Sequence, residues 1–194
     1  MSAEMSAEQL TGPADADRAV PLCVDLDGTL IKTDLFWESS VRLLKRNPLW
    51  LFALPIWWLK GRAHLKRQIA ARSGELDPAC LPYHEPFLEY LRSEHLQGRT
   101  LILATASDRS LAQPVADYID LFCDVLASDG KTNLRGAAKC RMLVKRYGER
   151  GFDYAGNSSV DLAVWRQARA AIVVNSHASL VRRAAKLAPV AKTF

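Results

Sequence analysis

The stretch LCVDLDGTLIKTD, residues 22–34, places two carboxylates, Asp25 and Asp27, at the end of an apolar run. Side chains two residues apart in a strand share one face, so both carboxylates point into the same space as the strand ends. Gly28 then lets the chain turn sharply and lets backbone N–H groups approach a ligand. Mg²⁺ between the carboxylates would remove their repulsion, because it is a hard cation that favours oxygen ligands. The alternative is a plain Asp-Gly turn with Asp25 exposed by chance.

Apolar runs of strand length recur along the chain and alternate with segments that are typical of helices. Several runs are continuously apolar, as expected for strands covered by helices on both faces. Helix signals lie between them, with Ser107 or Asp108 as an N-terminal cap and Gly98 and Gly148 after C-terminal ends. Ser158 or Ser159 is expected to open a further helix that runs through Arg169. The alternation predicts an α/β fold with a doubly wound parallel sheet, whose ligands bind beyond the carboxyl ends of the strands. The runs are PLCVDL (21–26), TLILAT (100–105), CDVLAS (123–128), FDYAG (152–156) and AAIVVN (170–175).

One segment, residues 33–81, breaks this alternation, because it is too long for a simple crossover and its pattern is helical throughout. We interpret it as a small helical cap inserted after the first strand, above the strand ends. The core then comprises residues 20–32 and 82–194. Residues 1–19 are acidic and rich in Ala and Ser, without the basic start and apolar centre of a signal peptide, so we predict a disordered leader.

Tryptophans and basic residues are concentrated inside the predicted cap, in NPLWLFALPIWWLKGRAHLKRQ (residues 47–68). Its apolar centre, Leu49 to Leu59, is about half the length that spans a bilayer, and Pro55 interrupts it. Aromatic side chains beside basic ones suit a membrane headgroup interface. The alternative is a packed helical hairpin whose tryptophans fill a small core of its own.

The overall composition excludes several classes of protein. The net charge is +5 and the pI is about 9.1, which is too weakly basic to predict a nucleic-acid partner. The four cysteines form no C-x-x-C pair, so neither a zinc ribbon nor a thioredoxin-like site is predicted, and the cytoplasm is the expected compartment. After Asp161 the chain has basic residues but no acidic one. This tail is either a solvated face or the contact for a negatively charged surface such as a membrane.

Four short motifs together resemble the signatures of the haloacid dehalogenase-like (HAD) phosphatases. LDGTL matches the first signature, with two aspartates one residue apart and then a threonine. TLILATAS resembles the second and carries Thr105, and GAAKCRML resembles the third and carries Lys139. FDYAGNSSVDLAVW resembles the fourth, with Asn157 and Asp161 at its polar positions. Single motifs of this length are weak, but four in the family's order over residues 20–176 are a strong resemblance.

The resemblance implies a role for each matched residue. Asp25 would attack phosphorus and form an aspartyl-phosphate, and Asp27 would protonate the leaving oxygen and then activate water, which is worth about 10²–10⁴-fold. Thr105 would bind a phosphoryl oxygen, and Lys139 would offset negative charge. Taken singly, Thr105 could cap a turn, and Lys139 could be a surface lysine. The expected contacts to the substrate phosphate are Gly28, Thr29, Ala106 and Ser107.

Mg²⁺ is the cofactor that the resemblance implies, held by Asp25, Asp27, Asn157 and Asp161, with Asp27 acting through its backbone carbonyl. Asp161 would act directly or through water; its plainer interpretation is a contact with its own helix N-terminus. Asn157 departs from the family, which usually has Asp there. Its neutral oxygen still suits Mg²⁺ but compensates less charge, so we expect catalysis to survive with weaker metal binding.

The arrangement of the cap resembles the phosphoserine phosphatase-like subgroup, and most closely the HAD-like unit that precedes a UbiA-type prenyltransferase in bacterial fusion proteins. This implies a Mg²⁺-dependent phosphohydrolase for a phosphorylated small-molecule or amphiphilic substrate, prenyl-linked or from a membrane pathway. It also implies contact with a membrane surface, or fusion to a membrane prenyltransferase domain, at the inner face of the membrane. The alternative is a catalytically weak module that binds a phosphorylated ligand or regulates an attached enzyme.

Overall fold

A single six-stranded parallel sheet forms the centre of the molecule, with strand order β3-β2-β1-β4-β5-β6. The structure is a computed structural model that describes residues 20–74 and 76–194, so the predicted leader lies outside the described residues. Its strands are β1 (Leu22–Val24), β2 (Leu101–Asp108), β3 (Asp124–Ser128), β4 (Asp153–Gly156), β5 (Ala171–Val173) and β6 (Val190–Thr193).

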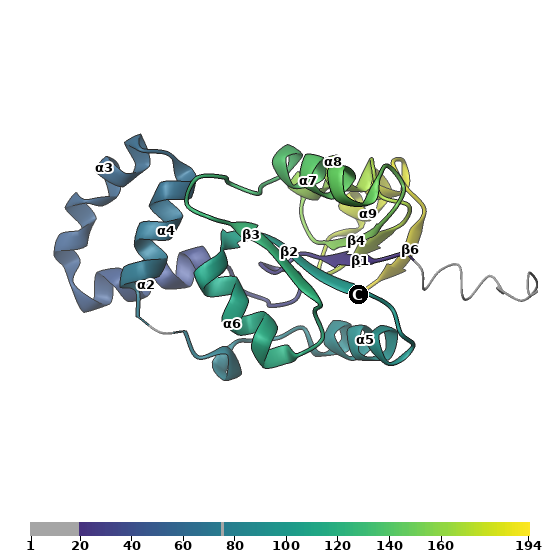
Figure 1. The fold of residues 1–194 in the computed structure, drawn as a ribbon, viewed down its shortest axis with the longest axis horizontal. Helices are drawn as coiled ribbons and strands as arrows, with labels where there is room; N and C mark the ends of the chain where they lie inside the picture. Colours follow the sequence, from purple (N-terminus) through teal and green to yellow (C-terminus); the bar gives the residue numbers. More distant parts are fainter. Residues whose placement is uncertain (1–19, 75) are drawn as a thin grey trace, which may run out of the picture.

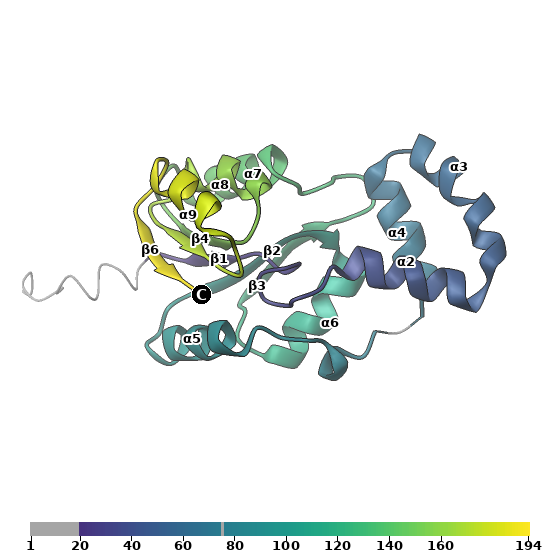
Figure 2. The same ribbon diagram turned by 180° about the vertical axis from the view of Figure 1, so that it is seen from behind.

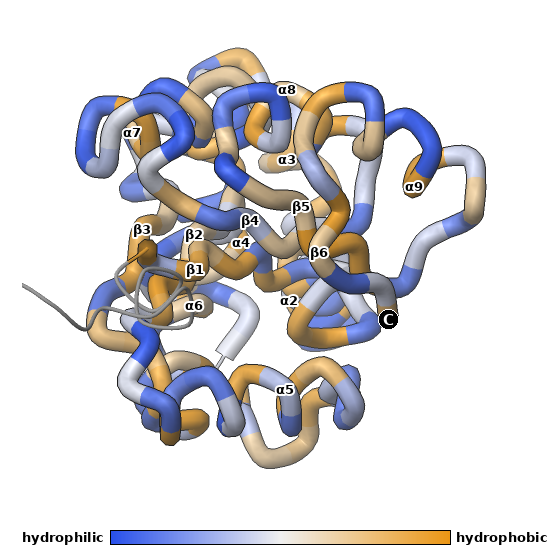
Figure 3. The backbone as a smooth tube through the Cα atoms, turned by 90° about the vertical axis from the view of Figure 1, so that its right-hand side faces the viewer, coloured by the Kyte–Doolittle hydropathy of each residue, from blue (hydrophilic) through white to orange (hydrophobic). Residues whose placement is uncertain are grey.

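Helices cover both faces of this sheet, as Figure 1 shows, with α7, α8 and α9 on one face and α5 and α6 on the other. The predicted α/β fold with a doubly wound parallel sheet is therefore confirmed. The orange colour of β1 and β2 at the centre of Figure 3 marks their apolar composition. The covering helices are α5 (Glu85–Leu96), α6 (Arg109–Ile119), α7 (Ala137–Tyr147), α8 (Leu162–Trp165) and α9 (Ala178–Ala185).

The central strand β1 shows why the sheet needs helices on both faces. Leu22 and Val24 belong to one buried apolar cluster, whereas Cys23 between them belongs to the cluster on the opposite face. All three side chains are fully buried. Burying a Leu or Val side chain contributes about 1.5–3 kcal/mol, so β1 is held in place from both faces.

The carboxyl-terminal part of the core differs from the sequence-based expectation in two places. The helix expected to run through Arg169 ends at Trp165, whose ring is buried and whose indole N–H donates to the carbonyl of Tyr154 at 3.0 Å. The basic tail contains a sixth strand, β6, which pairs in parallel with β5. The ring of Phe194 then lies 5.3 Å from that of Phe87. The strand was not predicted because its four residues, VAKT, do not form a continuous apolar run, and three of them are exposed.

Residues 35–72, within the predicted cap of residues 33–81, form a separate group of helices beyond the carboxyl ends of the strands, as the reverse view in Figure 2 also shows, whereas residues 78–80 pack against α6 of the core. Asp34 caps the first helix by accepting from the backbone N–H of Trp37 at 3.1 Å. Asn47 caps the next segment in the same way, with Pro48 at its first position. The elements are α2 (Leu35–Arg46), the 3₁₀ helix η1 (Pro48–Phe52), α3 (Leu54–Leu59), α4 (Arg62–Arg72) and the 3₁₀ helix η2 (Pro78–Cys80).

The cap has a small apolar core and an exposed apolar tip. Trp57 is buried against Leu43 and Leu65, and the ring of Trp50 lies 5.5 Å from that of Trp57. Trp58, in contrast, is 55% exposed. Trp50 and Trp57 therefore fill the core of a helical hairpin, whereas Trp58 and Trp37, the other two tryptophans of the cap, face solvent. Within the described residues no helix is long and apolar enough to cross a membrane.

Two basic side chains of α4 attach the cap to the core. Lys66 donates to the carbonyl of Ala106 at 2.7 Å, and Arg67 donates to the carbonyl of Asp129 at 2.7 Å. Both acceptors belong to the carboxyl-terminal ends of strands or the loops that follow them. These bonds hold the cap directly over the edge of the sheet where ligands bind in such folds.

Candidate active site

The loop after β1 turns tightly around one carbonyl group. The carbonyl of Leu26 accepts from the backbone N–H groups of Leu30 at 3.0 Å and Ile31 at 3.1 Å. Gly28 has φ 75°, a conformation that side chains with a Cβ rarely adopt, and a Cβ there would lie 2.1 Å from Nδ2 of Asn157. Glycine is therefore strongly favoured at this position. The turn leaves Asp25 and Asp27 beside one cavity.

Lys139 joins Asp25 from the neighbouring helix α7. Its Nζ donates to Oδ1 of Asp25 at 2.7 Å and to the hydroxyl of Tyr154 at 2.8 Å, and the lysine is 4% exposed. Burial raises the pKa of Asp25 to about 7, although Lys139 opposes the rise; the nearby carboxylates Asp161 and Asp27 add to it. Among the described residues, Oδ2 of Asp25 accepts no hydrogen bond. Asp25 thus has one oxygen fixed by a cation and the other available to a ligand.

Asp27 is held from two sides. Its Oδ1 accepts from the backbone N–H of Leu35 at 2.8 Å, at the start of α2, and its Oδ2 accepts from the hydroxyl of Ser107 at 2.6 Å. Burial raises the pKa of Asp27, while the bonds from Ser107 and Leu35 lower it. The raised pKa favours a carboxyl group that can carry a proton and release it, which is what a general acid requires.

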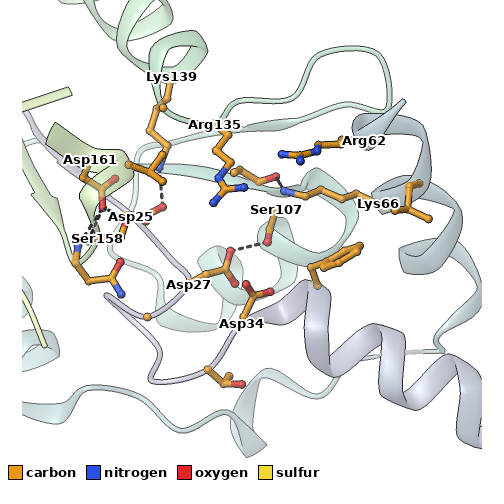
Figure 4. A pocket seen from close by; sticks show the side chains of 18 of the residues that line it. Asp25, Asp27, Asp34, Arg62, Lys66, Ser107, Arg135, Lys139, Ser158 and Asp161 are labelled. Atoms are coloured by element: carbon orange, nitrogen blue, oxygen red, sulfur yellow. Dashed lines mark hydrogen bonds and ion pairs between the residues drawn. The ribbon is translucent and has the colours of Figure 1, made fainter. Parts of the chain in front are cut away.

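A cavity of about 580 Å³ lies between the sheet edge and the cap, and Figure 4 shows its side chains. Eight of the ten residues predicted for the site line it: Asp25, Asp27, Gly28, Ala106, Ser107, Lys139, Asn157 and Asp161.

The other two predicted residues, Thr29 and Thr105, are fully buried and do not line the cavity. Thr105 accepts from the backbone N–H of Ser107 at 3.0 Å and lies 3.4 Å from Oδ2 of Asp27. Its hydroxyl therefore supports Ser107 and Asp27 from behind. The hydroxyl of Thr29 is buried without a hydrogen-bond partner among the described residues.

The chain matches one protein family. A match to the haloacid dehalogenase-like hydrolases covers residues 22–166, from β1 to just past α8. The chain belongs to this family. The HAD hydrolase is also 37% identical over 158 residues to y4nM, an uncharacterized protein of Sinorhizobium fredii (strain NBRC 101917 / NGR234). That alignment covers 81% of the chain but only 30% of the relative's length.

Solved structures confirm the HAD fold. A Bordetella pertussis Tohama I protein of unknown function has a TM-score of 0.66 at 16% identity, covering 88% of this chain and 96% of that one. A substrate-bound phosphoserine phosphatase has a TM-score of 0.60 at 11% identity, covering 91% and 92%. A phospho-aspartyl intermediate analogue of phosphoserine phosphatase scores 0.60 at 12% identity, covering 91% and 93%. At these identities the likeness establishes the fold alone.

The polar residues at the deep end of the site form one continuous chain of hydrogen bonds in the HAD hydrolase. The Tyr154 hydroxyl donates to Oδ1 of Asp161 at 2.9 Å. Oδ2 of Asp161 accepts from the backbone N–H groups of Asn157 at 3.1 Å and Ser158 at 2.9 Å, and from the Ser158 hydroxyl at 3.0 Å. Asp161 therefore organises the loop after β4, and both of its oxygens already have partners.

Oxygen donors for a cation lie at this deep end, although the described residues contain no group of three or more His, Cys, Asp or Glu side chains placed to hold a metal. Asp25 and the Asn157 amide both line the cavity. Because both oxygens of Asp161 are engaged, its contact with a cation would run through water. The residues present thus fit a hard cation with few anionic ligands.

Sequence reasoning missed several residues of the site. Tyr154 lies within an apolar strand run and was taken only as part of that run. Arg62 and Lys66 lie in the basic part of the predicted cap and Arg135 precedes α7; none of the three was predicted for the site, but all three line the cavity. The signal that could have indicated Tyr154 is strand alternation, which places it on the face opposite Ala155.

Proposed function

We propose that this HAD hydrolase is a Mg²⁺-dependent phosphohydrolase that cleaves a phosphomonoester through an aspartyl-phosphate on Asp25. The observation that carries the proposal is the ion pair of 2.7 Å between Asp25 and Lys139 at the floor of the cavity, with Asp27 fixed beside it. This arrangement supports a nucleophile, a positive charge for the phosphoryl group, and a separate proton carrier.

The residues of the chain divide the reaction into two steps. In the first, a carboxylate oxygen of Asp25 forms a bond to phosphorus while the bond to the leaving oxygen breaks, and Asp27 gives that oxygen its proton. In the second, Asp27 takes a proton from water, the water oxygen bonds to phosphorus, and the aspartyl-phosphate bond breaks, which restores Asp25. Lys139 stays paired with the anionic groups throughout, and Ser107 keeps Asp27 in position.

Mg²⁺ would be held by Asp25, the backbone carbonyl of Asp27 and the side-chain oxygen of Asn157, with Asp161 contributing through water. When bound, the cation would draw charge from the phosphoryl group and offset the repulsion between the buried carboxylates. Burial and neighbouring carboxylates raise the pKa of Asp25, which supports a site that gains from an added positive charge.

The test is hydrolysis of an aryl phosphate with Mg²⁺ and with a chelator, for wild type and Asp25→Asn. We expect metal-dependent turnover that falls by about 10³-fold or more in the variant, because the nucleophile is lost. Asp117→Asn is the matched control, since it makes the same change on the exposed side of α6. Equal turnover in Asp25→Asn and wild type would overturn the proposal.

The rival proposal is a catalytically weak module that binds a phosphorylated ligand or regulates an attached enzyme. Asn157 favours it, because a neutral ligand leaves less charge to hold the metal. Phosphate binding by calorimetry without turnover of any ester in a broad panel would support this module. Turnover that depends on both Mg²⁺ and Asp25 would exclude it.

The cap tip supports an amphiphilic substrate and contact with a lipid surface. We define the cap tip as the exposed apolar residues of η1 and α3: Leu49, Leu51, Phe52, Ile56, Trp58 and Leu59. From Ser39 to Gly74 the chain has eight basic residues and no acidic one, so the charge around the tip complements an anionic bilayer. Trp58 is exposed and also lines the cavity, so the tip continues into the site.

Sedimentation with anionic vesicles tests this contact. We expect the protein to pellet with the vesicles at low salt, and Leu59→Ser to lower the bound fraction several-fold. Leu96→Ser is the matched control, because Leu96 in α5 is exposed to the same 86% but lies away from the cap. Protein that stays in the supernatant at every salt concentration, or an equal loss in both variants, would contradict the contact.

The alignment with y4nM covers only part of that relative, and this supports a proposal about an attached domain. Because the chain spans 30% of the length of y4nM, a catalytic unit joined to a larger protein is consistent with the comparison. We propose a membrane prenyltransferase as the attached unit, and a prenyl-linked phosphate as the substrate, at the inner face of the membrane. Membrane fractionation of the full-length gene product checks this, and recovery in the soluble fraction would contradict it.

A further inference from the structure

Four basic residues besides Lys139 line the cavity; one is Lys32, in the loop after β1, and the other three converge on the cap side. Arg62 and Lys66 come from α4, and Arg135 comes from the loop before α7. Figure 4 shows these three labelled side chains pointing toward one another, whereas Lys139 lies on the other side with Asp25 and Asp161. The cavity therefore has two cationic regions.

In the part of the chain that the structure describes, the positive charges of the cap-side region, formed by Arg62, Lys66 and Arg135, are not neutralised by ion pairs. Within residues 20–74 and 76–194, none of Arg62, Lys66 and Arg135 forms an ion pair. Lys66 donates to the neutral carbonyl of Ala106, and the guanidinium of Arg62 lies 5.3 Å from the centre of the Trp58 ring.

Burial makes the surroundings of Lys66 unfavourable for a cation. Burial lowers the pKa of Lys66; the carboxylates of Asp27 and Asp34 oppose this shift, and the weaker effects of Arg135 and Lys139 add to it. None of the ion pairs in the described residues joins Lys66 to either carboxylate. An anion bound among the three cations would give the Lys66 ammonium a close charged partner.

We propose that Arg62, Lys66 and Arg135 form a second anion subsite that binds a phosphate group on the leaving group of the substrate. This inference rests on the proposed function, since it places the cleaved phosphoryl group at Asp25 and Lys139. Three cations suit a phosphate dianion better than a carboxylate, and each guanidinium can donate two parallel hydrogen bonds to phosphate oxygens. The substrate class is thus an organic bisphosphate, in which the cleaved group is a phosphomonoester, or an organic diphosphate, in which Asp25 attacks the terminal phosphorus and the bond that breaks is a phosphoanhydride.

Binding without turnover tests the subsite apart from catalysis. In Asp25→Asn protein and metal-free buffer, calorimetry compares inorganic phosphate, inorganic pyrophosphate and propane-1,3-diol bisphosphate. We expect at least one of the two-phosphate probes to bind at least about 10-fold more tightly than phosphate, since one added charge-assisted contact is worth 1.4 kcal/mol or more. Adding Arg62→Ala or Arg135→Ala reduces this preference below about 3-fold. Adding Arg141→Ala, an exposed charge loss on α7, leaves it in place.

Turnover by the wild-type protein then identifies the second anion. A higher kcat/KM for pyrophosphate than for the bisphosphate assigns a diphosphate, the reverse order assigns a bisphosphate, and both support the subsite. Propyl phosphate and phosphoserine are the comparison substrates. If kcat/KM for propyl phosphate equals kcat/KM for the two-phosphate compounds, the inference is overturned. It is also overturned if kcat/KM for phosphoserine equals kcat/KM for the two-phosphate compounds. Tight pyrophosphate binding without any turnover would keep the subsite and overturn the proposed hydrolysis.

Discussion

The Tyr154 hydroxyl lies between Lys139 and Asp161, accepting from the lysine Nζ at 2.8 Å and donating to the aspartate Oδ1 at 2.9 Å. Lys139 in turn contacts Asp25 at 2.7 Å. The buried phenol of Tyr154 therefore links Lys139, which contacts Asp25, to Asp161, which organises the loop after β4. Tyr154 was not part of the predicted site, and its position makes it a positioning residue for Lys139.

Tyr154→Phe tests this link, because it keeps the ring and removes only the hydroxyl. We expect unfolding to require about 1–3 kcal/mol less free energy, since a buried ammonium and a buried carboxylate each lose a partner. We expect kcat to fall about 10-fold, with a smaller change in KM. Chemical denaturation and steady-state kinetics measure the two effects. A loss of stability with wild-type kcat would show that the phenol only supports the fold.

Asn157→Asp addresses the departure from the family pattern. An added carboxylate beside Asp25 supplies the charge that Asn157 lacks, so we expect Mg²⁺ to bind about 10-fold more tightly and the metal-free protein to be less stable. Calorimetric titration with Mg²⁺ and thermal unfolding in chelator are the measurements. The prediction is wrong if the variant binds Mg²⁺ as the wild type does and its activity is unchanged.

Asp153 is the centre of a buried ion-pair network on the amino-terminal side of β4. It pairs with Arg99, which is 7% exposed, and with Arg169 through two hydrogen bonds of 2.9 and 2.7 Å. We expect Asp153→Ala to destabilise the protein by about 3 kcal/mol, because the arginines lose a buried partner. Asp124→Ala is the control, since its ion pair with Arg146 is partly open to solvent and is worth less than about 1 kcal/mol. Equal losses in urea unfolding would contradict this assignment.

The four cysteines are all free thiols, and they differ sharply in burial. Burial raises the pKa of Cys23 to about 12, so almost none of it is thiolate at pH 8. Cys80 is exposed. We expect iodoacetamide to modify Cys80 in the native protein at pH 8 and to spare Cys23 until urea unfolds the chain. Peptide mass spectrometry gives the order, and early modification of Cys23 would contradict the packing of β1.

The sequence predicted those parts of the molecule that follow from local patterns. The buried strands and the Asp25–Gly28 turn could be predicted because continuous apolar runs and a glycine at positive φ have few structural alternatives. Ser107 or Asp108 was predicted as the cap of α6 from its residue type, and the structure shows Asp108, which accepts from the Ser110 N–H at 3.1 Å. In contrast, β6 depends on hydrogen bonds to β5, which no local pattern specifies.

In the cavity, too, some residues could be predicted from local sequence and others could not. Asp25, Lys139 and Asp161 could be named because each lies in a short motif that resembles a HAD signature. The convergence of Arg62 with Arg135 could not, since they are 73 positions apart and meet only because α4 packs over the strand ends. Cap side chains are placed by tertiary packing, so the residues that choose a leaving group are the hardest to predict from sequence.

The most direct test of the central claim is chemical trapping of the phosphorylated carboxylate. Asp27→Asn protein is mixed with Mg²⁺ and an aryl phosphate, whose leaving group needs little proton transfer, and is then quenched in acid and reduced with borohydride. Reduction of an acyl phosphate converts an aspartate to homoserine, which peptide mass spectrometry locates. The account predicts conversion at Asp25 alone, and only when substrate and Mg²⁺ are both present. Release of phosphate with no conversion, or conversion at another carboxylate, would contradict it.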